Sequence, residues 1–183
     1  GREVVNTLNG IIQFGKGVNS SLTEEASSVR EYLQAAGIDA RIPEDMIRGI
    51  WKKWMLNVGI NQVSALTGAR YGQIAHVPQA NALFVRAMEE VLALAKAAKV
   101  DLREEDVEEY KKLIETFSPD AKTSMLQDME AGRKTELEDF SGVLLKLASR
   151  YEVPVPINSV LYEALRAKEA IRLEAAHAAS REK

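Results

Sequence analysis

The chain has 183 residues, of which 46% are hydrophobic, and a formal net charge of −3 at pH 7. This length and composition allow one well-filled core, with room for part of a second domain. The lack of cysteine excludes disulfides, cysteine nucleophiles and thiolate metal sites. The acidic balance, without a Lys/Arg block interleaved with aromatics, argues against nucleic-acid binding.

Metal and membrane binding are also disfavoured. The two histidines, His76 and His177, are too few and too far apart for a zinc or iron site, so we expect no metal. No segment reaches the roughly 18 consecutive apolar residues of a membrane span, and the first residues lack a signal-peptide pattern. The sequence predicts a soluble, cytoplasmic protein.

The first twenty residues predict two short strands. Val4 and Val5 form one apolar pair, residues 11–14 form a second run, and an Asn-Gly pair between them is typical of a hairpin. A lone hairpin is marginal in water. We therefore interpret residues 1–20 as the strand remnant of another, truncated domain, and residues 21–183 as a helical domain.

From Leu22 onward the pattern is helical, and we predict an all-α body. The segment "SLTEEASSVREYLQAAG" has a cap region, acids in its first turn and a glycine end. The next helix is expected to begin at Pro43, and a loop is expected around residues 67–79. Later helices are predicted at residues 78–99, 103–117, 136–151 and 158–180.

The helix around Trp51 carries a polar stripe. Lys53, Asn57 and Asn61 follow one another at four-residue spacing, so they stack along one side with a drift of about 40° per step. Two asparagines one turn apart in an apolar helix need a reason, because asparagine is a mediocre helix former. The stripe is a solvated edge, a pair of asparagines that tie down a neighbouring loop, or a pocket wall that faces an oxyanion or carboxylate, with Lys53 as a proton donor.

The stretch "TSMLQDMEAGRKTE", residues 123–136, contains two possible helix starts. Ser124 and Gln127 fit one capping box, and Thr135 and Glu138 fit a second. These local rules do not explain Asp128, one turn after Ser124. The stretch therefore needs an explanation beyond helix capping.

Four segments together resemble a known family. The segments are "WKKWMLNVGINQVSALTG", "PQANALFVRAMEEV", "TSMLQDMEAGRKTELEDFSG" and "VPVPINSVLYEALRAKE". In this order and at these separations they resemble the C-terminal half of ketopantoate reductase (2-dehydropantoate 2-reductase), over residues 40–169. The resemblance implies a helical domain of the 6-phosphogluconate-dehydrogenase-C-like type, and "IIQFGKG" resembles the last strands of the N-terminal dinucleotide-binding domain.

The resemblance also implies roles for individual residues. Lys53 would be the general acid that protonates the C2 oxygen of ketopantoate, and Glu136 would face it across the pocket. Lys52 is then expected at the surface. Substrate binding or its support is implied for Asn57, Asn61, Ser124, Asp128 and Glu90.

The implied cofactor is NADPH in the full-length enzyme of pantothenate biosynthesis. No G-x-G-x-x-G follows a strand in this chain, so we expect no tightly bound cofactor and no turnover by the fragment alone. The implied partners are ketopantoate, the missing N-terminal Rossmann domain and a second copy in a homodimer.

Two alternatives remain open at this point. A related reductase could act on another branched 2-oxo acid, because pocket shape sets selectivity. The chain could also be a non-catalytic helical interaction and dimerisation module. In the last helix, we interpret Arg166, Lys168 and Arg172 as a solvated face.

Overall fold

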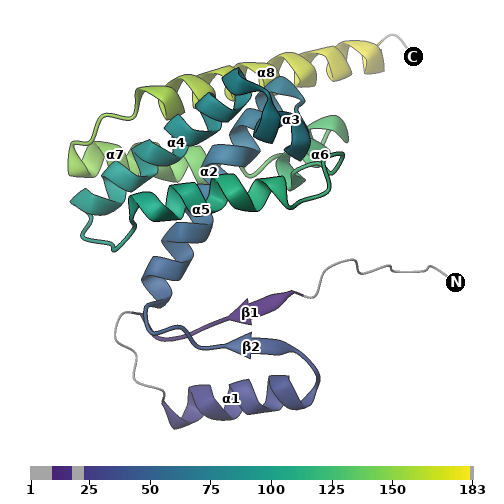
Figure 1. The fold of residues 1–183 in the computed structure, drawn as a ribbon. Coiled ribbons are helices and arrows are strands. Elements are labelled where there is room, and N and C mark those ends of the chain that lie inside the picture. Colours follow the sequence, from purple (N-terminus) through teal and green to yellow (C-terminus); the bar gives the residue numbers. More distant parts are fainter. Residues whose placement is uncertain (1–9, 18–22, 182–183) are drawn as a thin grey trace, which may run out of the picture. The chain divides into compact units, whose positions relative to one another are not determined.

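The computed structural model describes residues 10–17 and 23–181, and within them the protein is predominantly helical. The chain divides into two compact units, Gly1–Ile50 and Trp51–Lys183. Figure 1 shows the short strands confined to the first unit and most of the helices in the second. The all-α prediction for the body of the chain is confirmed.

The first unit contains β1 (Ile11–Gln13), α1 (Glu24–Ala35) and β2 (Asp39–Arg41). The two strands pair in parallel, with Ile12 opposite Ala40. Parallel neighbours need a crossover connection, and α1 provides it. The partner that the structure shows for β1 thus follows a helix; the predicted hairpin cannot be compared, because Val4 and Val5 lie outside the described residues.

The small sheet leaves apolar side chains in solvent. Ile11 is 50% exposed and Ile12 is 42% exposed, whereas Ala40 of β2 is fully buried. Parallel sheets are usually covered on both faces. Ile11 and Ile12 thus lack this cover, and the unit includes α1 and β2, which the sequence prediction assigned to the helical domain.

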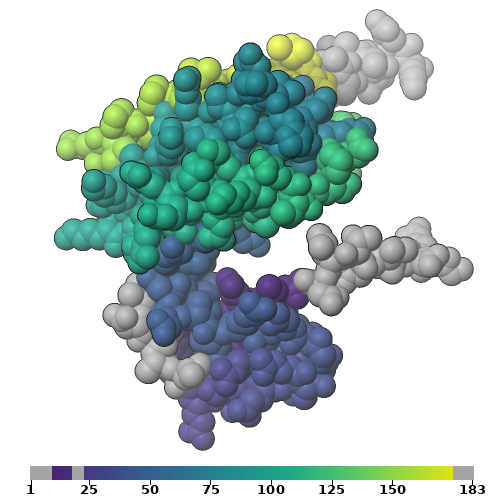
Figure 2. All heavy atoms as spheres, in the orientation of Figure 1, coloured from purple at the N-terminus to yellow at the C-terminus, as the bar shows by residue number. Residues whose placement is uncertain are grey.

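The second unit is built from helices around one core. Its elements are α2 (Met46–Thr67), which begins before the division, α3 (Tyr71–His76), α4 (Pro78–Ala97), α5 (Glu104–Glu115), α6 (Ser124–Glu130), the π-helix η1 (Glu138–Gly142), α7 (Val143–Tyr151) and α8 (Pro156–Arg181). In the space-filling view, α4 and α5 cover much of the visible face of this unit (Figure 2). No helix among residues 10–17 and 23–181 is long and apolar enough to cross a membrane.

Two helix starts differ from the prediction. α2 begins at Met46 and not at Pro43, and the Asp45 carboxylate accepts a hydrogen bond from the Arg48 amide at 2.8 Å, as an N-cap residue does. The predicted loop at residues 67–79 contains α3, because the side chain of Ile74 is fully buried in the core. Local patterns missed α3 because a six-residue helix depends on its tertiary contacts.

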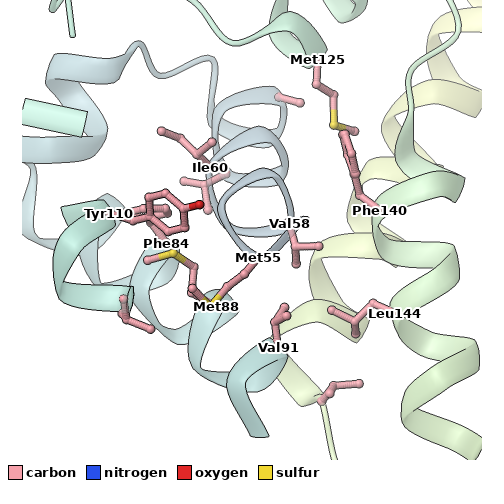
Figure 3. Packing of buried hydrophobic residues seen from close by; sticks show 14 of the residues in the cluster. Met55, Val58, Ile60, Phe84, Met88, Val91, Tyr110, Met125, Phe140 and Leu144 are labelled. Carbon is pink, nitrogen blue, oxygen red and sulfur yellow. The ribbon is translucent and has the colours of Figure 1, made fainter. Parts of the chain in front are cut away.

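α2 is the central helix of the second unit. Val58 and Ile60 lie on opposite sides of it, and both are at most 2% exposed (Figure 3). Gly59 allows α4 to approach closely, since a Cβ atom there would lie 2.8 Å from Cγ of Met88 and 2.9 Å from Cδ2 of Phe84. The second half of α2 is therefore packed closely against α4, and this packing fixes the position of the polar residues that it carries.

Candidate functional site

The polar stripe on α2 runs from solvent into the protein. Lys53 is exposed, Asn57 is half-buried and Asn61 is only 4% exposed. All three lie on one uninterrupted helix, as the spacing predicted. Asn61 is therefore mostly buried as a residue, whereas Lys53 is near the surface.

These three side chains make no hydrogen bond or ion pair with any other residue that the structure describes. Although Asn61 as a residue is 4% exposed, its amide atoms are not among the fully buried side-chain atoms that lack a partner, so the amide keeps some contact with solvent. An amide that reaches solvent and makes no hydrogen bond within the described part of the chain can bind a polar ligand. Because so little of the residue is exposed, the solvated-edge interpretation fails for Asn61.

Ser124 is the first residue of α6, and it is exposed. The N-cap is Thr123, whose fully buried side chain accepts a hydrogen bond from the Leu126 amide at 3.2 Å. The prediction that Ser124 caps this helix is therefore wrong. Because Thr123 does the capping, the Ser124 hydroxyl can contact a ligand.

Glu136 lies in the connection between α6 and η1, and its side chain is exposed. Hydrophobic anchors fix both ends of this connection. Met125 of α6 and Phe140 of η1 point toward one another in the core beside α2 (Figure 3), and Leu137, next to Glu136, is 1% exposed. The same core thus anchors the segments that carry Ser124 and Glu136 and the helix that carries Lys53.

Asp128 closes the turn after α6. Its carboxylate forms an ion pair with Arg133 at 2.7 Å, and its carbonyl accepts the Arg133 amide at 2.9 Å. Gly132, with φ of 72°, ends the helix in the left-handed conformation that glycine adopts easily. Asp128 therefore stabilises this turn by contacts with the chain itself.

The second predicted capping box is also wrong. Glu138 does not reach back to Thr135; its Oε1 accepts hydrogen bonds from the Tyr162 hydroxyl at 3.0 Å and from Arg166 at 3.2 Å. The hydrogen bond to Glu138 raises the pKa of Tyr162, with a smaller contribution from burial. Glu138 therefore joins η1 to α8.

Glu90 binds the start of α8. Its carboxylate accepts the amides of Ile157 at 2.8 Å and Asn158 at 2.9 Å, and also the Asn158 side-chain amide at 2.7 Å. A carboxylate is favoured at a helix N-terminus by the free amides and the helix dipole. These contacts account for Glu90 as a structural residue, whereas the sequence predicted substrate binding.

A buried polar network extends from Glu90, and the sequence analysis did not identify its other members. Asn158 is fully buried, donates to the carbonyl of Ala87 at 3.1 Å and accepts from Gln62 Nε2 at 2.9 Å. Gln62 also donates to the Val58 carbonyl at 2.7 Å. The network joins α2, α4 and α8, and only the position of Asn158 just after Pro156 could have signalled it.

Lys52 is not a surface residue, contrary to the prediction. Its side chain is 19% exposed, and Nζ lies 3.0 Å from Asp106 and 2.6 Å from Glu109 of α5. Burial by itself would lower the pKa of Lys52, but the hydrogen bonds and charges of Glu109 and Asp106 outweigh it and raise the pKa. The two adjacent lysines therefore differ, because Lys52 is paired and Lys53 has no partner among the described residues.

We expect Lys52→Met to lower the free energy of unfolding by about 1–3 kcal/mol near pH 7, between the values for exposed and buried ion pairs. Because the pKa of Lys52 is raised in the folded state, this stabilisation is complete below about pH 10.5 and is lost as the pH rises through the folded pKa. Urea unfolding of wild type and variant near pH 7 and above pH 11 measures both effects.

The matched control is Lys53→Met, which we expect to change the free energy of unfolding by less than about 0.5 kcal/mol. Two results would show that the Lys52 ion pair does not stabilise the fold. One is an equal loss of unfolding free energy in the two variants. The other is a difference in unfolding free energy between Lys52→Met and wild type that grows with pH.

One cavity lies apart from the predicted site residues. A cavity of about 880 Å³ lies where α4 ends and α5 begins, and its lining includes Lys96, Val100 and Arg103 but none of the predicted site residues. Among the described residues, no group of three or more His, Asp or Glu side chains could hold a metal ion. No contact or cavity given by the described residues joins the α2 stripe to Ser124 and Glu136, so their common site stays a prediction from the sequence.

Comparison with known proteins identifies the family to which most of this chain is similar. The family model described as "Ketopantoate reductase PanE/ApbA C terminal" matches residues 45–169. The 2-dehydropantoate 2-reductase of Aquifex aeolicus is 31% identical over 143 residues, which cover 76% of this chain and 46% of that protein. The chain thus spans about half the length of such relatives.

Solved structures share the fold. A ketopantoate reductase of the PanE/ApbA family from Ralstonia eutropha superposes with a TM-score of 0.78 at 25% identity, over 90% of this chain and 53% of that one. A D-mandelate dehydrogenase, solved with NADH and anilino(oxo)acetate, superposes with a TM-score of 0.76 at 21% identity, over 82% of this chain and 63% of that one. The second likeness concerns the fold alone.

Proposed function

This chain belongs to the ketopantoate reductase family, and we propose that it forms the substrate-binding half of an NADPH-dependent enzyme that reduces ketopantoate to pantoate. The observation that carries the proposal is the α2 stripe, in which the buried Asn61 has no partner among the described residues. The stripe presents one ammonium and two amides, which suit a small 2-oxo acid.

Lys53 is the proton donor in this proposal. Reduction of the C2 carbonyl places negative charge on its oxygen, and the Lys53 ammonium can transfer a proton to that oxygen to give the hydroxyl group. Because Lys53 makes no ion pair with a described residue, its ammonium can turn toward a ligand. Glu136 would keep Lys53 charged and oriented across the site.

The remaining residues bind the substrate. The amides of Asn57 and Asn61 hold it along the stripe, and the Ser124 hydroxyl binds its carboxylate or hydroxyl region. Asp128 acts indirectly, because its carboxylate is already paired with Arg133. Glu90 is left out of the binding set, since its carboxylate is occupied by the start of α8.

The reaction also needs a hydride, and NADPH is the donor that the family implies. The chain has no G-x-G-x-x-G loop after a strand, so we assign no residue here to that cofactor. The exposed parallel strands β1 and β2 support an N-terminal dinucleotide-binding domain that continues their sheet. We propose that this domain precedes the chain in the intact enzyme, a cytoplasmic homodimer.

The test is a steady-state assay of the intact protein with ketopantoate and NADPH, following absorbance at 340 nm and pantoate by mass spectrometry. We expect equimolar NADPH consumption and pantoate formation. Pantoate binding to the 183-residue chain, measured by isothermal titration calorimetry, is a separate test. Absence of both signals would refute the proposal.

The alternative substrate is another 2-oxo acid. The fold does not fix this choice, since a D-mandelate dehydrogenase shares it. The same assay with a series of branched and aromatic 2-oxo acids, and with NADH in place of NADPH, decides between them. A kcat/KM for another acid that exceeds the value for ketopantoate would reassign the substrate.

A further inference from the structure

We propose that Glu169 and Arg172 of α8 are positioning residues that fix the connection carrying Glu136. This inference rests on the proposed function, in which Glu136 faces Lys53. The sequence analysis placed Arg172 on a solvated face, and the structure contradicts that interpretation. The evidence is a set of contacts from α8 to residues that precede Glu136 in the chain.

Glu169 binds the residue before Glu136. The hydroxyl of Thr135 donates to Glu169 Oε1 at 2.5 Å, and Thr135 is 6% exposed. A short hydrogen bond from a hydroxyl to a carboxylate is among the stronger types in proteins. The Thr135 side chain is therefore held against α8 and turned away from solvent.

Arg172 binds the start of the same connection. It donates to the carbonyl of Met129 and, at 3.0 Å, to the carbonyl of Arg133. Carbonyls at the end of a helix lack partners within the helix, and a cation is favoured there by the helix dipole. Arg172 thus fixes the C-terminal end of α6, while Asp128 holds the Arg133 side chain.

Together these contacts leave little freedom around Glu136. Thr135 on one side is bonded to Glu169, and Leu137 on the other side is 1% exposed in the core. Glu169 and Arg172 are three residues apart on α8 and so lie on the same face of the helix. The exposed carboxylate of Glu136 projects from a backbone that is fixed on both sides.

Other cations of α8 bind different targets and provide controls. Lys168 donates to the carbonyls of Ala65 and Leu66 at the end of α2, at 2.7 and 2.9 Å. Arg166 bonds to Glu138 of η1 and makes no hydrogen bond with the described residues 131–137 of the connection. Replacing Arg166 therefore removes an arginine side chain from the same helix but leaves the contacts of α8 with residues 132–136 in place.

The experiment compares Glu169→Leu and Arg172→Met with the control Arg166→Met in the intact enzyme. We expect the first two variants to lower kcat about tenfold, because misplacement of a catalytic group is costly, with KM changed less than about twofold. The control should keep the wild-type kcat. Thr135→Ser retains the hydroxyl and should keep the wild-type kcat. Thr135→Val lacks the hydroxyl and should lower kcat as much as Glu169→Leu does.

Hydrogen–deuterium exchange of the 183-residue chain measures the positioning without relying on activity. Peptides covering residues 132–137 should exchange faster in Glu169→Leu and Arg172→Met than in Arg166→Met. Faster exchange with unchanged kcat, equal kcat losses in all three variants, or no change in exchange would each overturn the inference.

The outcomes also separate this inference from the proposed function. If the wild-type enzyme reduces no 2-oxo acid, or if Glu136→Gln keeps full activity, the proposed role of Glu136 fails and the inference fails with it. If Glu136→Gln loses activity while Glu169→Leu and Thr135→Val do not, only the positioning role is wrong.

Discussion

Replacing Lys53 by alanine in the intact enzyme is expected to lower kcat by about 10²–10⁴-fold, the usual contribution of a general acid. The reason is that no other described cation lies on the polar stripe of α2, so nothing replaces the proton donor. KM should change less than kcat, because Asn57 and Asn61 still hold the substrate. Steady-state NADPH oxidation with ketopantoate as the varied substrate measures both constants.

Two further variants separate acid catalysis from charge and from folding. Lys53→Arg keeps a cation but not a good proton donor, because guanidinium does not deprotonate in the accessible pH range, so it should remain as slow as Lys53→Ala. Lys53→Met should unfold at the same urea concentration as the wild type. Wild-type turnover in Lys53→Ala would show that the proton comes from another group.

The α2 stripe could be predicted from the sequence because it depends on one helix. Four-residue spacing places Lys53, Asn57 and Asn61 on one side whatever the rest of the chain does, and the structure has α2 unbroken through all three. The burial of each residue of the stripe could not be predicted in the same way. The burial of Asn61 at 4% exposure depends on the neighbours that surround the second half of α2.

Other features depend on contacts between distant residues. Lys52 and Lys53 are adjacent lysines on one helix, but only Lys52 lies beside Asp106 and Glu109 of α5, which pair with it. The parallel pairing of β1 needs β2, which lies beyond a helix, so local turn signals could not indicate it. Spacing rules cannot detect such pairs, because they compare residues within a few turns of one helix or strand.

The cap of α6 shows a finer limit. Thr123 and Ser124 are both good N-cap residues, so the sequence allows either. Burial of Thr123 and of Met125, two residues later, fixes the start of the helix and makes Thr123 the cap. The shift of the cap from Ser124 to Thr123 matters for the proposed function, because it leaves the Ser124 hydroxyl uninvolved in capping.

Asn158→Leu is expected to lower the free energy of unfolding by about 2–4 kcal/mol, since it breaks a buried network and leaves several groups without partners. Leucine has a similar volume, so the loss does not come from a cavity. The Glu90 carboxylate loses the 2.7 Å bond from Asn158, the Ala87 carbonyl loses its 3.1 Å bond, and Gln62 loses its 2.9 Å acceptor. Urea unfolding of the 183-residue chain at neutral pH gives the value.

The matched variant is Gln62→Leu, which should cost less than Asn158→Leu. Gln62 Oε1 is buried and has no hydrogen-bond partner among the described residues, so the substitution also removes an unsatisfied acceptor. Because the two residues share a bond, the double variant should lose less than the sum of the single losses. Additive losses, or a larger loss for Gln62→Leu, would mean that the two amides stabilise the second unit independently and that Asn158 does not couple α2 to Glu90.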